Sequence, residues 1–261
     1  MSPTLPTVVL LAQGDELTAG QTVDTNSSWL AQNLHRLGYK VTGIAICPDQ
    51  PSAIQKALHV ASSQGDVVIS TGGLGPTADD YTAEAAARWA GVDLVLHEES
   101  LERIETIWKS RNRVMPASNQ KQAMVPASST ILTNHWGTAP GFLVEHKNTR
   151  AFFLPGVPRE MRQFWTNHLE PMLRQNTLAQ PRRRAVLRCI GIAESQLQDR
   201  LNALPLPAEV GIHYKTQLPE NRIIIDAPGE LNQRDFDQAA QLVQQHIGPS
   251  CLGINTPPLP E

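Results

Sequence analysis

The stretch Asp66–Asp80, DVVISTGGLGPTADD, decides the fold of this chain of 261 residues. Its first half is a short continuous apolar run, which is typical of a buried parallel strand. Three glycines and two acids follow at once. Glycine lets the backbone take positive φ angles and come close to a ligand, and the N–H groups before a helix N-terminus suit an anionic phosphate. We therefore predict a strand, a phosphate-binding loop and a helix, in this order.

Similar strands and helices alternate on both sides of this stretch. Strands are predicted at 7–12 and 39–46, each followed by a helical pattern at 25–37 and 52–64. After the loop, the pattern predicts helices at 83–90, 98–111 and 159–174, a short strand at 131–132 and a hairpin of strands at 141–145 and 150–154. This β-α-β-α-β-loop-α order favours an α/β fold with a mostly parallel sheet and helices on both faces.

A polar segment with Pro181 separates this region from the rest of the chain. We place domain one at residues 1–175 and a small α+β domain at 182–250, followed by a flexible, proline-rich tail at 251–261. The basic cluster Arg182-Arg183-Arg184 is interpreted as a solvated linker between the two domains.

Composition excludes several classes of function. A net charge of −3 and a pI near 6.2 make nucleic acid an unlikely partner, and no apolar run is long enough to span a membrane. Three widely separated cysteines fit a reducing, cytoplasmic location and thiols without a special role. The histidines lack zinc-ligand spacing, and the glycine loop is neither a Walker A nor a G-x-G-x-x-G motif. A Gly-x-Ser-x-Gly nucleophile elbow is also absent from the sequence.

The unusual residues fall at the predicted carboxyl ends of strands, where open parallel sheets bind ligands. They are Gly14-Asp15-Glu16, Asp49, the glycine loop and Pro155-Gly156-Val157-Pro158. Each has an ordinary alternative: a solvated turn at Asp15 and Glu16, a helix-starting turn at Asp49, and a helix entry at Pro158.

Asp79 and Asp80 would repel a bare pyrophosphate unless a divalent cation bridges them to it. Alternatively, one of the two caps the following helix and only the other, for which we favour Asp80, reaches the ligand. The candidate metal ligands are Asp15, Glu16, Asp79 and Asp80.

Several motifs in this order resemble the CinA (competence/damage-inducible) family and its molybdopterin-binding-like domain. They are Gly14-Asp15-Glu16-Leu17, Thr25-Asn26, the glycine loop with Asp79-Asp80, Asn119-x-Lys121-Gln122-Ala123, Gly137-Thr138-Ala139-Pro140-Gly141 and Leu154-Pro155-Gly156-Val157-Pro158-x-Glu160-Met161. The match covers about residues 7–170, and Gly191-Ile192-x-Glu194-Ser195 is similar to the family's small second domain. The family usually has a longer form with a C-terminal amidase domain, which this sequence does not reach.

The resemblance implies a three-layer α/β/α first domain, a homodimer and a small-molecule nucleotide or pterin as ligand. It implies metal-dependent hydrolysis of ADP-ribose to AMP and ribose 5-phosphate, with a divalent cation (Mg, Mn or Co) and a potassium requirement. Catalytic roles carry over to Asp80 and Asp49, although Gln50 follows Asp49 where family members commonly have a second acid. The expected phosphate- or nucleotide-binding residues are Gly14, Asn26, Gly72, Gly73, Leu74, Gly75, Pro76, Thr77, Gly156, Val157 and Pro158.

Two other functions are compatible with the same pocket. The chain could be a non-catalytic module that binds molybdopterin or a nucleotide, or a nucleotidyl transferase acting on a pterin. Metal-dependent release of AMP from ADP-ribose distinguishes the hydrolase from both.

Overall fold

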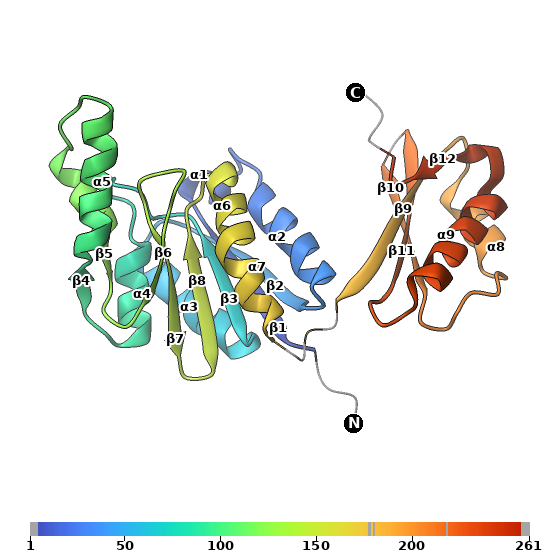
Figure 1. Ribbon diagram of the computed structural model, residues 1–261, viewed down its shortest axis with the longest axis horizontal. Helices are drawn as coiled ribbons and strands as arrows, with labels where there is room; N and C mark the ends of the chain where they lie inside the picture. The colour runs from blue at the N-terminus through green and yellow to red at the C-terminus, as the bar shows by residue number, and fades with distance from the viewer. Residues whose placement is uncertain (1–4, 177–178, 180, 218, 257–261) are drawn as a thin grey trace. The chain divides into compact units, whose positions relative to one another are not determined.

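The computed structural model describes residues 5–176, 179, 181–217 and 219–256. The chain divides into two compact units, Met1–Ala179 and Gln180–Glu261, each with its own hydrophobic core (Figure 1).

Unit 1 is built on a six-stranded sheet with the order β2-β1-β3-β8-β7-β6. Its strands are β1 (Thr7–Gln13), β2 (Lys40–Cys47), β3 (Val67–Thr71), β6 (Thr130–Leu132), β7 (Gly141–His146) and β8 (Thr149–Leu154). The pairs β1–β2, β1–β3 and β3–β8 are parallel, whereas β6 and β7 are antiparallel additions at one side. The carboxyl ends of β1, β2, β3 and β8 therefore meet at one edge of the sheet.

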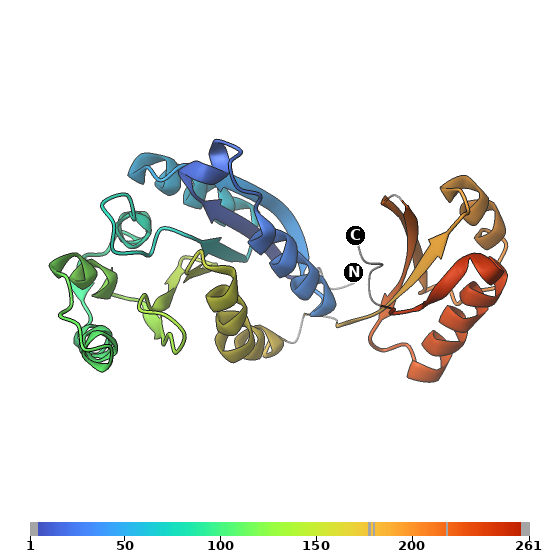
Figure 2. The same ribbon diagram turned by 90° about the horizontal axis from the view of Figure 1, so that it is seen from above.

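Helices cover both faces of this sheet, as Figure 2 shows. They are α1 (Asp15–Thr18), α2 (Thr25–Arg36), α3 (Pro51–Gln64), α4 (Thr82–Ala90), α5 (Glu98–Ser110), the 3-10 helix η1 (Ala117–Ala123) and a C-terminal helix made of α6 (Pro158–Phe164), the π-helical turn η2 (Trp165–Leu169) and α7 (Glu170–Arg174). Buried side chains of α2 and the C-terminal helix form one core layer, and those of α3 and α4 form the other. The predicted three-layer α/β/α architecture is confirmed.

One element of unit 1 was not predicted. The short strands β4 (Leu94–Leu96) and β5 (Met124–Pro126) pair antiparallel beside α5. Three residues give too short a pattern for a period of two to be visible, so their pairing depends on tertiary contacts.

Unit 2 is the predicted small α+β domain. An antiparallel sheet in the order β10-β11-β9-β12 packs one face against two helices. The elements are β9 (Arg182–Ile190), α8 (Glu194–Leu201), β10 (Gly211–Gln217), β11 (Glu220–Pro228), α9 (Gln233–Ile247), the 3-10 helix η3 (Gly248–Ser250) and β12 (Cys251–Ile254). The flexible tail predicted from residue 251 was wrong over its first four residues, because they form β12 against β9. Residues 257–261 of that tail lie outside the described part of the chain.

The basic cluster is not a solvated linker, which corrects the prediction made for it. Arg182 and Arg183 belong to β9: the first pairs with Asp226 at 2.6 Å, and the second donates to the Leu231 carbonyl oxygen at 2.8 Å. Acceptors that lie about 45 residues further along the chain give these arginines a structural role, which local sequence could not show.

Candidate functional site at the carboxyl ends of the parallel strands

Hydrogen bonds between neighbouring strand ends hold the loops of this edge together. Gly72 N donates to the Leu154 carbonyl oxygen at 3.0 Å, and Gly14 N donates to the Cys47 carbonyl oxygen at 3.1 Å. Gly72 has a φ of 108°, and a Cβ atom there would collide with the Gln13 carbonyl oxygen. Only glycine fits this position, and its positive φ is as predicted; the predicted close approach to a ligand stays a prediction.

The glycine loop presents unengaged backbone donors. Gly73 also has a positive φ, 64°. Within the described residues, no hydrogen bond engages the N–H groups of Gly73, Leu74 or Gly75, whereas those of Gly72 and Thr77 are bonded. Successive free N–H groups in such a conformation form a concave site for an anion.

A buried polar network supports the loop from below, and sequence reasoning missed it. The Thr82 hydroxyl lies 2.6 Å from Gln13 Oε1 and 2.9 Å from the Gly72 carbonyl oxygen, and Gln13 Nε2 donates to Ser70 Oγ. These three side chains are at most 4% exposed. Polar groups this deeply buried are costly unless they are paired, so the network holds the loop in one conformation. The available signal was a polar Gln13 ending an otherwise apolar run.

Asp80 shapes the glycine loop and does not cap the helix after it. Its Oδ2 accepts from Thr77 N at 2.8 Å and from Thr77 Oγ1. The N-cap of α4 is Tyr81, which makes no capping hydrogen bond through its side chain. The alternative in which Asp79 or Asp80 caps this helix was therefore wrong.

Lys121 was also not predicted as a site residue, although the motif that contains it was identified in the sequence. Its Nζ donates to the Thr77 carbonyl oxygen at 2.8 Å and lies 5.0 Å from the centroid of the Tyr81 ring. It brings a positive charge from η1 to the glycine loop, where the charge can attract a phosphate.

Four carboxylates, those of Asp15, Glu16, Asp49 and Asp79, lie close enough to interact at this same edge of the sheet. Asp15 and Asp49 bond reciprocally: Asp15 N donates to Asp49 Oδ2, and Asp49 N donates to Asp15 Oδ1, both at 3.1 Å. Burial raises the pKa of Asp49, and the negative charges of Asp15, Glu16 and Asp79 raise it further against the opposing hydrogen bond from Asp15. The charge of Asp79 thus acts on Asp49, but both Asp79 and Asp80 lie beside Thr77: a hydrogen bond with Thr77 is the largest cause that lowers the pKa of Asp79, and Thr77 N donates to Asp80 Oδ2.

Two buried oxygen atoms in this region have no hydrogen-bond partner. One is Asp49 Oδ1, and the other is Oδ1 of Asn26, at the start of α2. Asn26 Nδ2 donates to the Gly156 carbonyl oxygen at 2.8 Å, which places α2 beside the loop after β8. A Cβ atom on Gly156 would lie 3.3 Å from Gly72 Cα, so the two glycine-containing loops touch. Val157 and Pro158 are exposed at the start of α6.

The acids fit a divalent cation only in part. No group of three or more His, Cys, Asp or Glu side chains within the described ranges is arranged to hold a metal ion. Magnesium, however, is commonly held by one or two carboxylates together with phosphate oxygens and water. The unpartnered Asp49 Oδ1 and the repulsion around it are what a cation arriving with a phosphate ligand would relieve.

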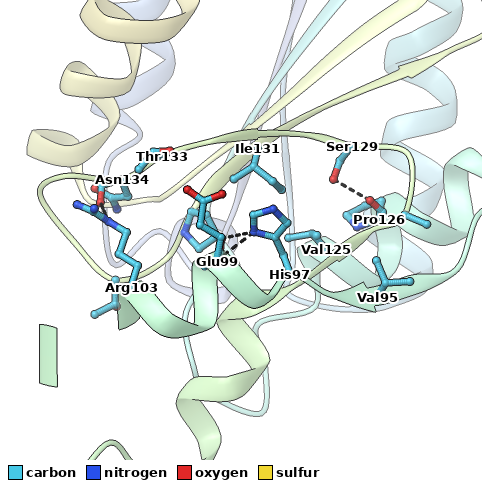
Figure 3. Close-up of a pocket in the computed structure, with 14 residues that line it drawn as sticks. Val95, His97, Glu99, Arg103, Val125, Pro126, Ser129, Ile131, Thr133 and Asn134 are labelled. Carbon is cyan, nitrogen blue, oxygen red and sulfur yellow. Dashed lines mark hydrogen bonds between the residues drawn. The ribbon is translucent and has the colours of Figure 1, made fainter. Parts of the chain in front are cut away.

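A pocket of about 300 Å³ lies away from the edge where the parallel strands end, between α5 and the segment after β5 (Figure 3). Val95 and Val125 line it, whereas Leu94 and Met124, on the other side of the β4–β5 pair, line a smaller hollow of about 70 Å³ beside the glycine loop. We assign the candidate site to the edge of the sheet where the parallel strands end, because the free donors and the uncompensated acids lie there.

No helix of the described residues is both long and apolar enough to cross a membrane.

Comparison with known proteins matches residues 9–175 to a family model described as "Probable molybdopterin binding domain". The chain is 37% identical over 248 residues to a CinA-like protein of Syntrophotalea carbinolica and 37% identical over 254 residues to one of Escherichia coli. These matches cover 95% and 97% of this chain but 60% and 63% of the relatives, so the chain spans about three fifths of their length.

A solved structure of a CinA protein is also similar to this chain. The crystal structure of the protein CinA from Thermoplasma acidophilum aligns with a TM-score of 0.60 at 32% identity, over 65% of this chain and 98% of that one.

Proposed function

We propose that this chain, which belongs to the CinA family and carries its molybdopterin-binding-like domain, is a divalent-metal-dependent nucleotide pyrophosphatase that hydrolyses ADP-ribose to AMP and ribose 5-phosphate. The observation that carries the proposal is that two unlike sets of groups, which we call its two walls, lie at the edge where the parallel strands end. One wall offers free backbone donors at Gly73, Leu74 and Gly75, and the other holds the carboxylates around Asp49.

The first wall binds the pyrophosphate. The loop donors and the Lys121 ammonium supply positive potential where phosphate oxygens lie, and the buried network under Thr82 keeps the donors in place. Donors that are already oriented lose little entropy when the ligand binds. The loop turn closed by Asp80 is part of this wall, and the catalytic role of Asp80 stays a prediction.

The second wall supports the chemistry. We assign one or two of the carboxylates of Asp15, Glu16 and Asp79, together with phosphate oxygens of the ligand, to hold the divalent cation, which would neutralise the phosphates and acidify water. Asp49 Oδ1, buried and unpartnered, is assigned to accept the proton of the attacking water. The water oxygen then joins one phosphorus, the P–O bond to the bridging oxygen breaks, and the second phosphate leaves with that oxygen.

Product analysis tests this proposal. The purified chain is incubated with ADP-ribose and Mg²⁺, Mn²⁺ or Co²⁺, with and without K⁺, and AMP is measured by chromatography. Metal-dependent AMP is expected from the wild type and is lost in Asp49→Asn. Asp66→Asn is the matched control, because Asp66 lies at the opposite edge of the sheet and bonds Thr7 N at 2.8 Å. Turnover that persists in Asp49→Asn, or fails equally in Asp66→Asn, contradicts the assignment.

A non-catalytic binding module is the second candidate, favoured by the lack of a preformed three-ligand metal cluster in the described chain. It predicts that ADP-ribose or a pterin raises the melting temperature without any product. Release of pyrophosphate from ATP and a pterin would instead support a nucleotidyl transferase. A homodimer is part of our proposal, and sedimentation equilibrium of the purified chain tests it.

A further inference from the structure

Two cysteines that are 62 positions apart in sequence become direct neighbours in unit 2. Cys189 on β9 and Cys251 on β12 are register partners in an antiparallel pair. Their wide separation in sequence had predicted thiols without a special role. The third cysteine, Cys47, belongs to β2 in unit 1.

The geometry of the pair suits a disulfide bond. Residues directly opposite each other in antiparallel strands have Cα atoms about 4.5–5.5 Å apart, which lies within the range that disulfides span, about 4.4–6.8 Å. The two side chains also interact: burial raises the pKa of Cys189 to about 12, and the adjacent Cys251 contributes to this shift. Both are free thiols in this structure.

The two thiols differ in access to solvent. Cys189 is fully buried, whereas Cys251 is partly exposed on the edge strand β12. A reagent from solution can therefore reach Cys251 first, while Cys189 is shielded from everything except its neighbour. This asymmetry is typical of a pair in which one thiol reacts and the other resolves the product.

We propose that Cys189 and Cys251 are a modification site that forms a reversible intramolecular disulfide with a low-molecular-weight disulfide as oxidant. The Cys251 thiolate attacks one sulfur of the oxidant, which forms a mixed disulfide and releases one thiol. Cys189 Sγ, which gives up its proton as it reacts, then attacks Cys251 Sγ; the internal bond forms, and the second thiolate of the oxidant leaves and takes up a proton. Two protein thiols are oxidised and one disulfide is reduced to two thiols, so atoms and electrons balance.

The disulfide bond would link the edge strand β12 covalently to β9. β12 is an edge strand that pairs only with β9 within the described sheet, and it follows α9 and η3 directly. A bond between Cys189 and Cys251 closes a loop of about 60 residues, which restricts the unfolded chain and slows the release of β12. Oxidation therefore stabilises the pairing of β12 with β9 in unit 2.

Intact mass and peptide mapping of the full chain test the proposal. The native protein is incubated with oxidised glutathione, the remaining thiols are blocked, and the protein is digested without reduction. We expect the wild type to lose the mass of two hydrogen atoms and to yield one linked peptide pair that contains Cys189 and Cys251. Dithiothreitol should restore the original mass. Cys47→Ala is the matched control and should give the same linked pair in the same yield.

Single variants separate the two steps. Cys189→Ala should stop at a glutathione adduct on Cys251, and Cys251→Ser should gain no adduct while it stays folded, because Cys189 is shielded. Circular dichroism confirms folding of each variant before oxidation. The proposal is overturned if folded wild-type protein keeps both thiols, if it accumulates only the adduct, or if its bonds join two chains through Cys251.

Discussion

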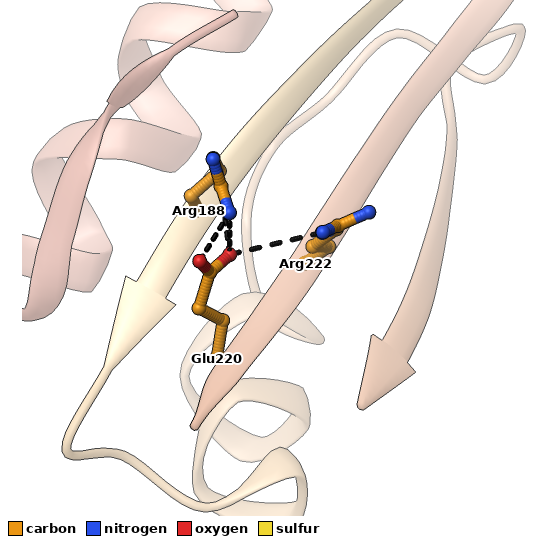
Figure 4. A network of polar contacts seen from close by, with 3 residues as sticks. All are labelled: Arg188, Glu220 and Arg222. Atoms are coloured by element: carbon orange, nitrogen blue, oxygen red, sulfur yellow. Dashed lines mark hydrogen bonds and ion pairs between the residues drawn. The ribbon is translucent and has the colours of Figure 1, made fainter. Parts of the chain in front are cut away.

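Two carboxylate sites, one in each unit, differ in how far their negative charge is compensated. In unit 2, the buried Arg188 forms an ion pair with Glu220, and Arg222 Nε lies 3.7 Å from Oε2 of the same carboxylate (Figure 4). In unit 1, Asp49 is surrounded by three further acids, and its buried Oδ1 has no partner. Both arrangements contain partly or fully buried carboxylates, but only the first supplies cations to compensate them.

The pKa shifts of two single carboxyl groups, Asp226 and Asp49, show the same difference. Burial would raise the pKa of Asp226 in unit 2, but the hydrogen bond and charge of Arg182, together with His213, hold it below its usual range. The pKa of Asp49 in unit 1 is raised. Compensated charge contributes to the stability of the fold, whereas uncompensated charge at a strand edge costs stability unless a ligand supplies the missing cation.

The sharpest way to break this comparison is to remove the carboxylate of the buried pair. Glu220→Ala leaves Arg188 buried without its partner, and we expect a loss of about 3–5 kcal/mol in the free energy of unfolding of unit 2. Denaturant unfolding monitored by circular dichroism measures it. Glu105→Gln is the control, because Glu105 pairs with Lys109 on the exposed face of α5 and should cost about 0.5 kcal/mol or less. Equal effects of the two variants would show that the buried pair is no more important than a surface pair.

The glycine loop offers the next largest effect. Gly72→Ala meets both a positive φ and the Gln13 carbonyl oxygen, so we expect a loss of more than about 2 kcal/mol together with the loss of phosphate binding. Gly91→Ala is the matched control: its φ is 71°, but no atom lies within 4 Å of the added carbon. It should cost about 1 kcal/mol and leave binding intact. Thermal unfolding and AMP titration measure both quantities, and similar losses in both variants would show that the loop has no special fit.

Acid titration sharpens the comparison between the two carboxylates. Because the folded pKa of Asp226 is lowered, its contribution to stability is complete above the unfolded pKa of about 3.9 and is lost as pH falls through the folded value. We expect Arg182→Met to flatten the decline in stability of unit 2 below about pH 4. Unfolding free energies measured from pH 2 to 6 check this, and an unchanged slope would mean that Arg182 does not hold the proton equilibrium of Asp226.

The smallest expected effect has the opposite sign. The raised pKa of Asp49 means that its ionised form is disfavoured by folding, so stability should increase as pH falls through the folded pKa. Asp49→Asn should therefore leave the free energy of unfolding unchanged or increase it by less than about 1 kcal/mol, since the side chain is only partly buried. Chemical unfolding at neutral pH measures it. A clear destabilisation would show that Asp49 serves the fold instead of the ligand.

The sequence predicted what depends on local pattern. Apolar runs located the parallel strands, and glycines located the loop at the edge where ligands bind. It missed contacts between distant segments: the Gln13–Ser70–Thr82 network, the β4–β5 pair and the partners of Arg182. It also gave Asp79 and Asp80 the same metal-binding role, although Asp80 Oδ2 accepts from Thr77 N and closes a turn of the glycine loop.

The proposed mechanism requires the acids around Asp49 to bind a cation together with a phosphate ligand. Calorimetric titration of AMP into the wild type and Asp49→Asn, each with and without Mn²⁺, tests it most directly. We predict that Mn²⁺ tightens AMP binding to the wild type by at least about tenfold, about 1.4 kcal/mol, and has little effect on AMP binding to Asp49→Asn. AMP affinity that is the same with and without Mn²⁺ in the wild type, or equal tightening in both proteins, would contradict the claim.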